Sequence, residues 1–185
     1  MSQFVRYRGA ANSWVRFTMP SNGRVTAQYE FRSSATSVTT LFNTLDPFAD
    51  RWRGCVLGGG SSTNVRVQQL FVDGVLTTAT TQGQLSNLVR DGNWHTLRYV
   101  AWSRSGTGPD NTNQHLTGEQ LEFANYSQFA ASPVADLRNF KIDVGLTGSW
   151  THESTLGDSN GFSQQNVDIL TIGSRRRRHS GSYGL

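Results

Sequence analysis

Apolar and polar residues alternate along much of the chain. Between Val25 and Arg32, the apolar side chains of Val25, Ala27, Tyr29 and Phe31 alternate with four polar ones. Because successive side chains of a β-strand point to opposite faces, this pattern predicts a strand with one buried face. Such strands are typical of antiparallel sheets that cover a core on one side.

Similar patterns recur from one end of the chain to the other. The further predicted strands are Phe4 to Tyr7, Trp14 to Phe17, Thr39 to Asn43, Cys55 to Leu57, Trp94 to Trp102, Phe140 to Leu146 and Ile169 to Ile172. Two more, Arg66 to Val72 and Val75 to Thr80, flank the dipeptide Asp73-Gly74. Because Asp-Gly accepts the positive φ of a type I′ turn, we predict a hairpin here, in a chain of roughly nine or ten short strands.

Helical signals are weak, because Gly and β-branched residues interrupt most windows. Only Gln120 to Phe129 has a spacing that suits one or two helical turns. The polar segments Ser103 to Gln120 and Thr151 to Gln165 are predicted to be long loops, which in compact domains are usually functional or held by a partner. No fixed repeat and no Pro/Ser-rich linker divides the chain, so we expect one sandwich domain over residues 1–173 and a basic tail over residues 174–185.

Composition agrees with a β-rich fold. Ser, Thr, Asn and Gln make up about a third of the 185 residues, and 19 Gly add to them, a composition that suits short strands joined by polar turns. Aromatic residues make up 11% of the chain, which is too many for a disordered protein. We therefore predict an all-β fold, an antiparallel two-sheet sandwich or jelly roll.

One motif connects this fold to a known class. The segment from Asp91 through Gly92, Trp94 and His95 to Leu97 resembles the D-G-x-W-H-x-hydrophobic signature of laminin G-like and pentraxin-like domains, which are concanavalin A-like jelly rolls. The resemblance implies that Asp-Gly turns the chain into a strand and that Trp94 is buried between the two sheets, with its N–H bonded to the backbone.

Two further stretches resemble this family. They are the hairpin from Val5-Arg6-Tyr7-Arg8-Gly9 to Trp14-Val15-Arg16-Phe17, and the late strand Leu170-Thr171-Ile172-Gly173-Ser174-Arg175. The chain departs from the family at Val72-Asp73-Gly74, which precedes the Trp-His strand instead of following it. The family also continues with one more strand after the Ile-Gly strand, and we expect the first strand or a neighbouring subunit to take its place.

Catalytic motifs are missing from the sequence. Glycosidases built on this sandwich resemble one another in a Glu-x-Asp-x-x-Glu strand that sets two carboxylates beside one glycosidic bond. The four Glu of this chain, at 30, 119, 122 and 153, do not form it, and Glu119 and Glu122 are predicted to lie in a loop. Gly-x-Ser-x-Gly elbows and phosphate-binding loops are also missing. We expect a protein that is not an enzyme.

Metal ligands are sparse. The single Cys55 excludes a disulfide framework and a zinc site of paired cysteines, and His95 has no second ligand at helical or strand spacing. Asp110, Asn111 and Asn113 supply oxygen ligands that Ca²⁺ prefers. Asx-rich turns have the same composition without any metal, so no cofactor is expected apart from calcium as an open alternative.

Sugar recognition needs exposed aromatic rings that stack on a pyranose, with amides and carboxylates around them. Trp52, Trp102, Tyr126 and Trp150 are the candidate stacking residues, since they lie in or beside predicted loops or on a strand that is apolar on both faces. The alternative for that strand is a central position under loops or another subunit.

The run Arg175, Arg176, Arg177 and Arg178 is the strongest charge feature of a chain with formal net charge +4. Adjacent arginines favour an acidic partner or phosphates. No aromatic residues that could stack bases interleave with them. We therefore favour a tail that is solvated or contacts another subunit over a nucleic-acid site.

These observations lead to a non-enzymatic binding and assembly module. No apolar run approaches the ~20 residues that span a bilayer, and the first residues show no export pattern. We expect a virion structural protein, such as a bacteriophage capsid decoration, head-fibre or tail component. It would be made in the host cytoplasm, would form homo-oligomers or bind other virion subunits, and would have a surface glycan as a further ligand. The alternative is an extracellular carbohydrate-binding module of a larger protein.

Overall fold

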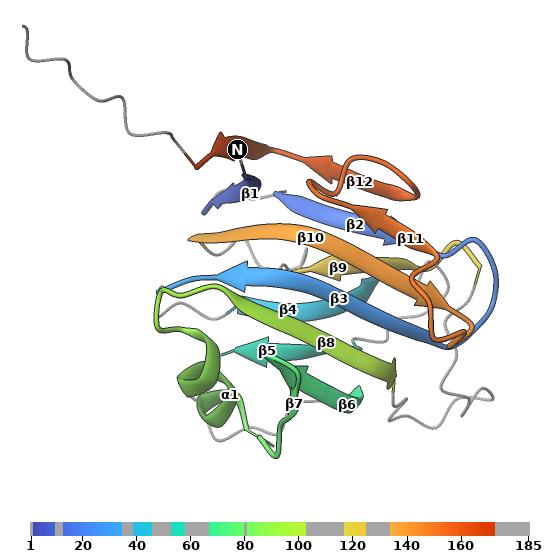
Figure 1. Cartoon of the computed structure of the whole chain (residues 1–185), viewed down its shortest axis with the longest axis horizontal. Coiled ribbons are helices and arrows are strands. Elements are labelled where there is room, and N and C mark those ends of the chain that lie inside the picture. Colours follow the sequence, from blue (N-terminus) through green and yellow to red (C-terminus); the bar gives the residue numbers. More distant parts are fainter. Residues whose placement is uncertain are drawn as a thin grey trace, which may run out of the picture.

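The computed structural model of the chain is an all-β sandwich of two antiparallel sheets (Figure 1). It confirms the predicted fold class and is compatible with a jelly roll. Residues 2–9, 13–34, 39–45, 53–57, 67–79, 81–102, 117–124 and 134–172 are described, and the structural statements below concern them.

The described residues form thirteen strands and one helix. They are β1 (Gln3–Arg8), β2 (Trp14–Thr18), β3 (Val25–Arg32), β4 (Thr39–Leu45), β5 (Arg53–Leu57), β6 (Val67–Val72), β7 (Val75–Leu76), α1 (Gln82–Val89), β8 (His95–Trp102), β9 (Gln120–Phe123), β10 (Val134–Val144), β11 (His152–Ser154), β12 (Phe162–Gln165) and β13 (Val167–Thr171). Each strand predicted from alternation is present, although β10 begins earlier than expected and β7 is shorter.

The larger sheet has the strand order β13-β1-β10-β3-β8-β6-β7, and β11 also pairs with β10. The smaller sheet has the order β12-β2-β9-β4-β5. Consecutive strands often lie in different sheets, so the chain crosses repeatedly between the two layers. The first strand, β1, lies between β13 and β10 in the larger sheet and pairs with the late strand β13.

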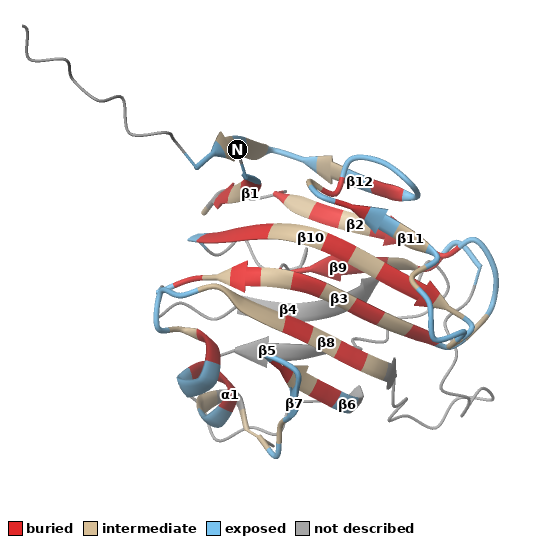
Figure 2. Ribbon diagram, viewed as in Figure 1, coloured by how far each residue is buried: buried red, intermediate tan, exposed pale blue. Residues whose placement is uncertain are grey.

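The core lies between the sheets and is rich in aromatic rings. Tyr29 and Phe31 of β3 alternate with partly exposed polar residues, as the sequence pattern predicted (Figure 2). Tyr29 packs edge-to-face against Phe123 of the smaller sheet, and Phe123 packs in the same way on Phe140 of β10. These contacts join strands that are far apart in the sequence.

Tyr7 connects the sheets by hydrogen bonds as well as by packing. Its ring is fully buried, and its hydroxyl donates to the Phe123 carbonyl and accepts from the Val15 N–H at 2.9 Å. Burial raises the pKa of Tyr7 far above its ordinary value, so the hydroxyl keeps its proton. One side chain of β1 is thus bonded to both β9 and β2.

The predicted hairpin at Asp73-Gly74 is confirmed. Asp73 has φ of 51° and Gly74 has φ of 81°, and a type I′ turn requires positive φ at both central residues. Strand β7 ends at Leu76, but Thr77 still donates its backbone N–H to the Leu70 carbonyl at 2.8 Å.

The helical prediction was wrong in position. Residues 120–123 form strand β9, whereas the helix α1 lies at Gln82–Val89. Thr81 begins this helix with a capping box, in which its side chain accepts from the Gln84 N–H and the Gln84 side chain accepts from the Thr81 N–H. Leu85 and Val89, four residues apart, are fully buried against the core.

The segment Thr151 to Gln165, predicted to be a loop, contains β11 and β12. It is ordered by local bonds, in which the Ser154 hydroxyl accepts from the Gly157 N–H at 2.9 Å. Strand β10 is long enough to pair with β1 in its first half and with β11 in its second half. Between the halves its pairing with β3 shifts register, and Asn139 adopts a positive φ of 55°.

Candidate binding face on the larger sheet

The Trp-His motif forms a turn held by two carboxylates. Gly92 has φ of 83°, which suits glycine, and Asp91 accepts bonds from the backbone and side chain of Asn93, both at 2.8 Å. His95 Nδ1 lies 2.7 Å from an Asp73 oxygen, and Nε2 lies 2.9 Å from an Asp91 oxygen. The two Asp-Gly turns therefore meet at His95.

This arrangement favours the charged form of His95. Carboxylate oxygens only accept hydrogen bonds, so both ring nitrogens must donate. Burial opposes the charge, but the bonds to Asp73 and then Asp91 outweigh it and raise the pKa of His95. The bonds that Asp91 accepts, first from the Asn93 N–H and then from His95, lower the pKa of that carboxyl. This is an ion-pair cluster rather than a metal site.

The implied position of Trp94 between the sheets is wrong. Trp94 is only partly buried, and its ring stacks with the guanidinium groups of Arg32 and Arg138, whose carbons lie 4.6 and 4.2 Å from the ring centre. Both arginines alternate with core residues of β3 and β10, so they point away from the core. Trp94 therefore lies on the outer face of the larger sheet.

Phe4 completes this outer aromatic group. It packs edge-to-face on Trp94, with centroids 5.8 Å apart, and is 5% exposed although it lies on the outside of the sandwich. Arg6 and Arg32 cover its ring at 5.5 and 5.3 Å. We call Phe4, Arg6, Arg32, Trp94, Asp136 and Arg138 the arginine–aromatic cluster.

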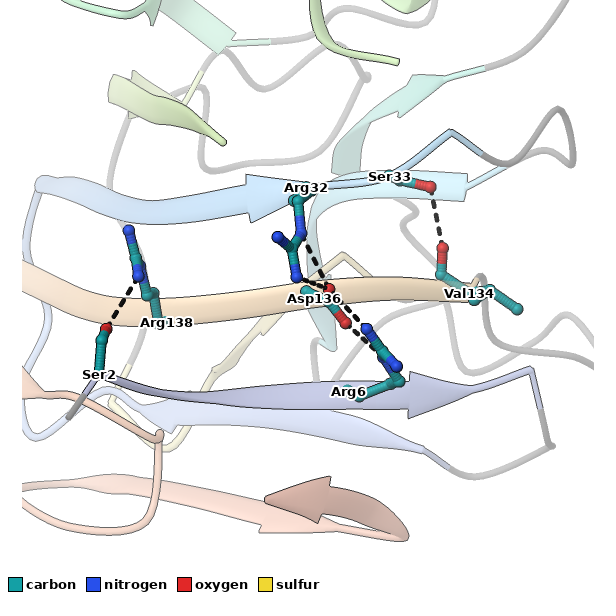
Figure 3. Close-up of polar contacts among 7 residues, drawn as sticks. All are labelled: Ser2, Arg6, Arg32, Ser33, Val134, Asp136 and Arg138. Atoms are coloured by element: carbon teal, nitrogen blue, oxygen red, sulfur yellow. Dashed lines mark hydrogen bonds and ion pairs between the residues drawn. The ribbon is translucent and has the colours of Figure 1, made fainter. Parts of the chain in front are cut away.

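Asp136 fixes two of these arginines. It receives Arg6 Nε at 2.6 Å and Nη2 at 3.0 Å, and Arg32 Nε at 3.0 Å and Nη2 at 2.5 Å (Figure 3). The three residues lie side by side in the registers of β1, β10 and β3. The hydrogen bond to Asp136, aided by its charge and that of Asp168, raises the pKa of Arg6. A cavity of about 280 Å³ borders these side chains.

Arg138 is fixed in the neighbouring row. It donates from Nε to Glu30 at 2.6 Å and from Nη1 to the Ser2 hydroxyl at 2.9 Å. Asn139, in its left-handed conformation, donates to the other Glu30 oxygen at 2.6 Å. Asp136 and Glu30 thus hold Arg6, Arg32 and Arg138 in ion pairs on this face.

A polar pocket of about 450 Å³ lies further along the same face. It is lined by Gln28, Glu30, Asn139, Phe140, Lys141, Glu153, Ser154 and Thr155. Lys141 forms an ion pair with Glu153 at 2.9 Å, and its ammonium lies 5.9 Å from the centre of the Trp150 ring. Trp150, a predicted stacking residue, is therefore close to a pocket of amides, carboxylates and hydroxyls, the groups that bind sugars.

The face carries no strand or helix of the described chain over it, as Figure 1 shows with the larger sheet toward the viewer. Sequence analysis missed it because Phe4, Arg32 and Asp136 are distant in the chain. The signal available was the alternation in β3, which places Gln28, Glu30 and Arg32 opposite the buried side.

Glu122 lies in strand β9, which corrects the loop prediction for that residue, while Glu119 directly precedes the strand. Both are fully buried, and Glu122 forms a 2.7 Å ion pair with Arg16, whose guanidinium covers the Trp14 ring. A carboxylate in such a pair has a structural role.

The remaining predicted sites are not tested by the geometry. Most of them lie outside the described residues: Trp52, Tyr126, the calcium candidates Asp110, Asn111 and Asn113, and the arginines Arg175, Arg176, Arg177 and Arg178. Trp102 lies at the end of β8, and only its backbone is described. In the part of the chain that is described, no helix is long and apolar enough to cross a membrane, and no group of three or more His, Cys, Asp or Glu side chains is placed to hold a metal ion.

The fold and this face define an antiparallel β-sandwich with an open, charged and aromatic outer sheet. Comparison with protein-family models, with curated proteins and with solved structures yields no match. The resemblance to laminin G-like domains therefore depends on the short sequence motifs and the sandwich architecture.

Proposed function

We propose that this chain is a non-enzymatic binding and assembly module. The observation that carries the proposal is the arginine–aromatic cluster, which holds charged and aromatic groups in fixed positions on an uncovered face. Arginine and aromatic residues are enriched in protein interfaces. Groups that are already fixed lose less conformational entropy on binding. The face is therefore suited to docking on another protein surface.

Within that class we favour a virion structural protein, such as a bacteriophage capsid decoration, head-fibre or tail component. A module that repeats in a symmetric shell needs a well-defined docking face, and the arginine–aromatic cluster supplies one. The basic segment Arg175 to Arg178 is the second proposed contact with the shell. The other virion subunits would be its partners, and the virion would be its location.

Labelling of particles tests this proposal. Antibodies to the chain should label virions from the source culture in negative-stain electron microscopy. Trp94→Ala should weaken co-sedimentation with those particles at least about tenfold, because one side of the cluster is lost. Val75→Ala is the matched control, because Val75 is exposed in the hairpin strand β7 at the edge of the larger sheet and is not a member of the cluster. This variant should co-sediment normally. Unlabelled particles, or normal co-sedimentation of Trp94→Ala, would contradict the proposal.

The pocket beside Trp150 favours a second candidate, a carbohydrate-binding module. Glu153, Lys141 and Asn139 offer directional hydrogen bonds, and the Trp150 ring offers a surface for a pyranose. A glycan array probed with the purified chain tests this function. Trp150→Ala should remove the signal and Trp94→Ala should keep it. An array without signal, or one that Trp150→Ala leaves unchanged, would exclude this function.

A further inference from the structure

Strand β13 forms one edge of the larger sheet. It pairs with β1 in an antiparallel register that sets Val5 against Ile169 and Gln3 against Thr171, and no other described strand pairs with it. It is the dark red strand at the upper margin of Figure 1. The opposite edge of the sheet, β7, is only two residues long, and short edge strands are poor templates for pairing.

The hydrogen-bond pattern shows which backbone groups point outward. Ile172 donates its N–H to the Ser2 carbonyl at 2.9 Å, so Ser2 and Ile172, which directly flank β1 and β13, face each other as a hydrogen-bonded pair. Such pairs alternate along an antiparallel ladder. The N–H and C=O groups of Asp168 and Leu170 therefore also point toward β1, while those of Val167, Ile169 and Thr171 point away from the sheet.

Apolar side chains accompany this open edge. Ile169 is 42% exposed and Ile172 is 44% exposed. Asp168 carries the only charge on the strand, and its position beside Arg6 in the register partly neutralises it. Proteins usually block open edges with lysine, proline or an inward-pointing charge. The outward-pointing residues of β13, which are Val167, Ile169 and Thr171, include no lysine, no proline and no charged residue.

We propose that β13 is a self-association edge, and that its occupant is β13 of a second copy of this chain in antiparallel orientation. A two-fold axis through Ile169 places Ile169 opposite its own copy and Val167 opposite Thr171 of that copy. All three outward residues then pair within residues 167–171, forming about six backbone hydrogen bonds. The two larger sheets become one continuous sheet.

The self-complementary register favours a second copy over a foreign strand. An axis through Asp168 would set two carboxylates directly opposite each other, which is unfavourable. The axis through Ile169 instead places the exposed Ile169 side chains of the two copies opposite each other, where they contact each other on the same face of the joined sheet. An interface of this isologous kind closes as a dimer. This inference does not depend on the proposed function, since the partner is the chain itself.

Sedimentation of the full chain tests the proposal. We expect a concentration-dependent dimer between about 1 and 100 µM. Ile169→Lys and, separately, Thr171→Pro should each weaken the dimer at least about tenfold, because the first places a charge at the axis and the second removes an outward N–H. Neither change removes a bond to β1, and circular dichroism with a thermal melt checks that each variant stays folded.

Matched controls separate this edge from other contacts. Val75→Lys places the same charge on the opposite edge of the same sheet, at a residue that is 69% exposed, and should leave the dimer intact. Deletion of residues 174–185 and addition of salt should also leave it intact, because the contact consists of backbone bonds and isoleucine. A monomer at every concentration, a dimer unaffected by Ile169→Lys and Thr171→Pro, or a dimer lost with residues 174–185 would overturn the proposal.

Discussion

Tyr7→Phe isolates the hydrogen bonds that join the two sheets. The substitution keeps the ring in its fully buried site and removes a single oxygen. The lost hydroxyl bonds with the Val15 N–H at 2.9 Å and with the Phe123 carbonyl. Each buried polar group left without a partner costs about 1 to 3 kcal/mol. With two such groups, we expect the free energy of unfolding to fall by about 2 to 6 kcal/mol.

Urea denaturation followed by tryptophan fluorescence measures this change, and the m-value should stay the same because the fold is retained. Thr78→Val is the control, since it also removes a hydroxyl but at an exposed position, and it should change the unfolding free energy by less than about 0.5 kcal/mol. If Tyr7→Phe loses no more than the control, the hydroxyl does not join the sheets and the argument from buried hydrogen bonds fails.

Three further predictions test the turn, the cluster and a close approach. Trp94→Ala should lower the unfolding free energy by about 1 to 3 kcal/mol, since it loses ring contacts on the outer face, whereas Phe140→Ala in the core should lower it by about 3 to 5 kcal/mol. Equal losses in urea denaturation would show that Trp94 contributes as a core residue does. Because the pKa of His95 is raised, the contribution of charged His95 to the stability of the fold is complete below about pH 6.5 and declines as pH rises through the raised value. Because the pKa of Asp91 is lowered, the contribution of the Asp91 carboxylate declines only in acid. The melting temperature of His95→Gln should thus fall furthest below that of the native chain near pH 5 to 6 and approach it near pH 9; a gap that is independent of pH would contradict the ion-pair cluster. Gly157→Ala should prevent folding or cost more than about 3 kcal/mol, because Gly157 has φ of 71° and a β-carbon there would lie 2.3 Å from Val15 Cγ1. Gly74→Ala, with φ of 81° and open space around it, should cost only about 1 kcal/mol, and equal melting temperatures for the two variants would show that the contact with Val15 is not limiting.

Local sequence was sufficient for most strands and for the hairpin turn, but it missed β9, β11 and β12. In β3 the period-two alternation coincides with the observed burial of Tyr29 and Phe31, because neighbouring side chains of a strand must face opposite sides. The Asp73-Gly74 turn was equally predictable, since Asp-Gly readily accepts the positive φ that a type I′ turn requires. The helix Gln82–Val89 was predictable in principle from its capping box, but the few residues of its apolar stripe were a weaker signal.

Only the tertiary structure decided what the outer face carries. Arg6, Arg32 and Asp136 are separated by up to 130 residues in the chain, and they meet because β1, β10 and β3 are neighbours in one sheet. The Trp94 motif was visible in the sequence, yet which face its ring covers depends on the strands beside it. Strand pairing is a long-range choice that no local pattern encodes, so the sequence alone determined the sandwich and its alternation, whereas strand order determined the cluster, the polar pocket and the open edge at β13.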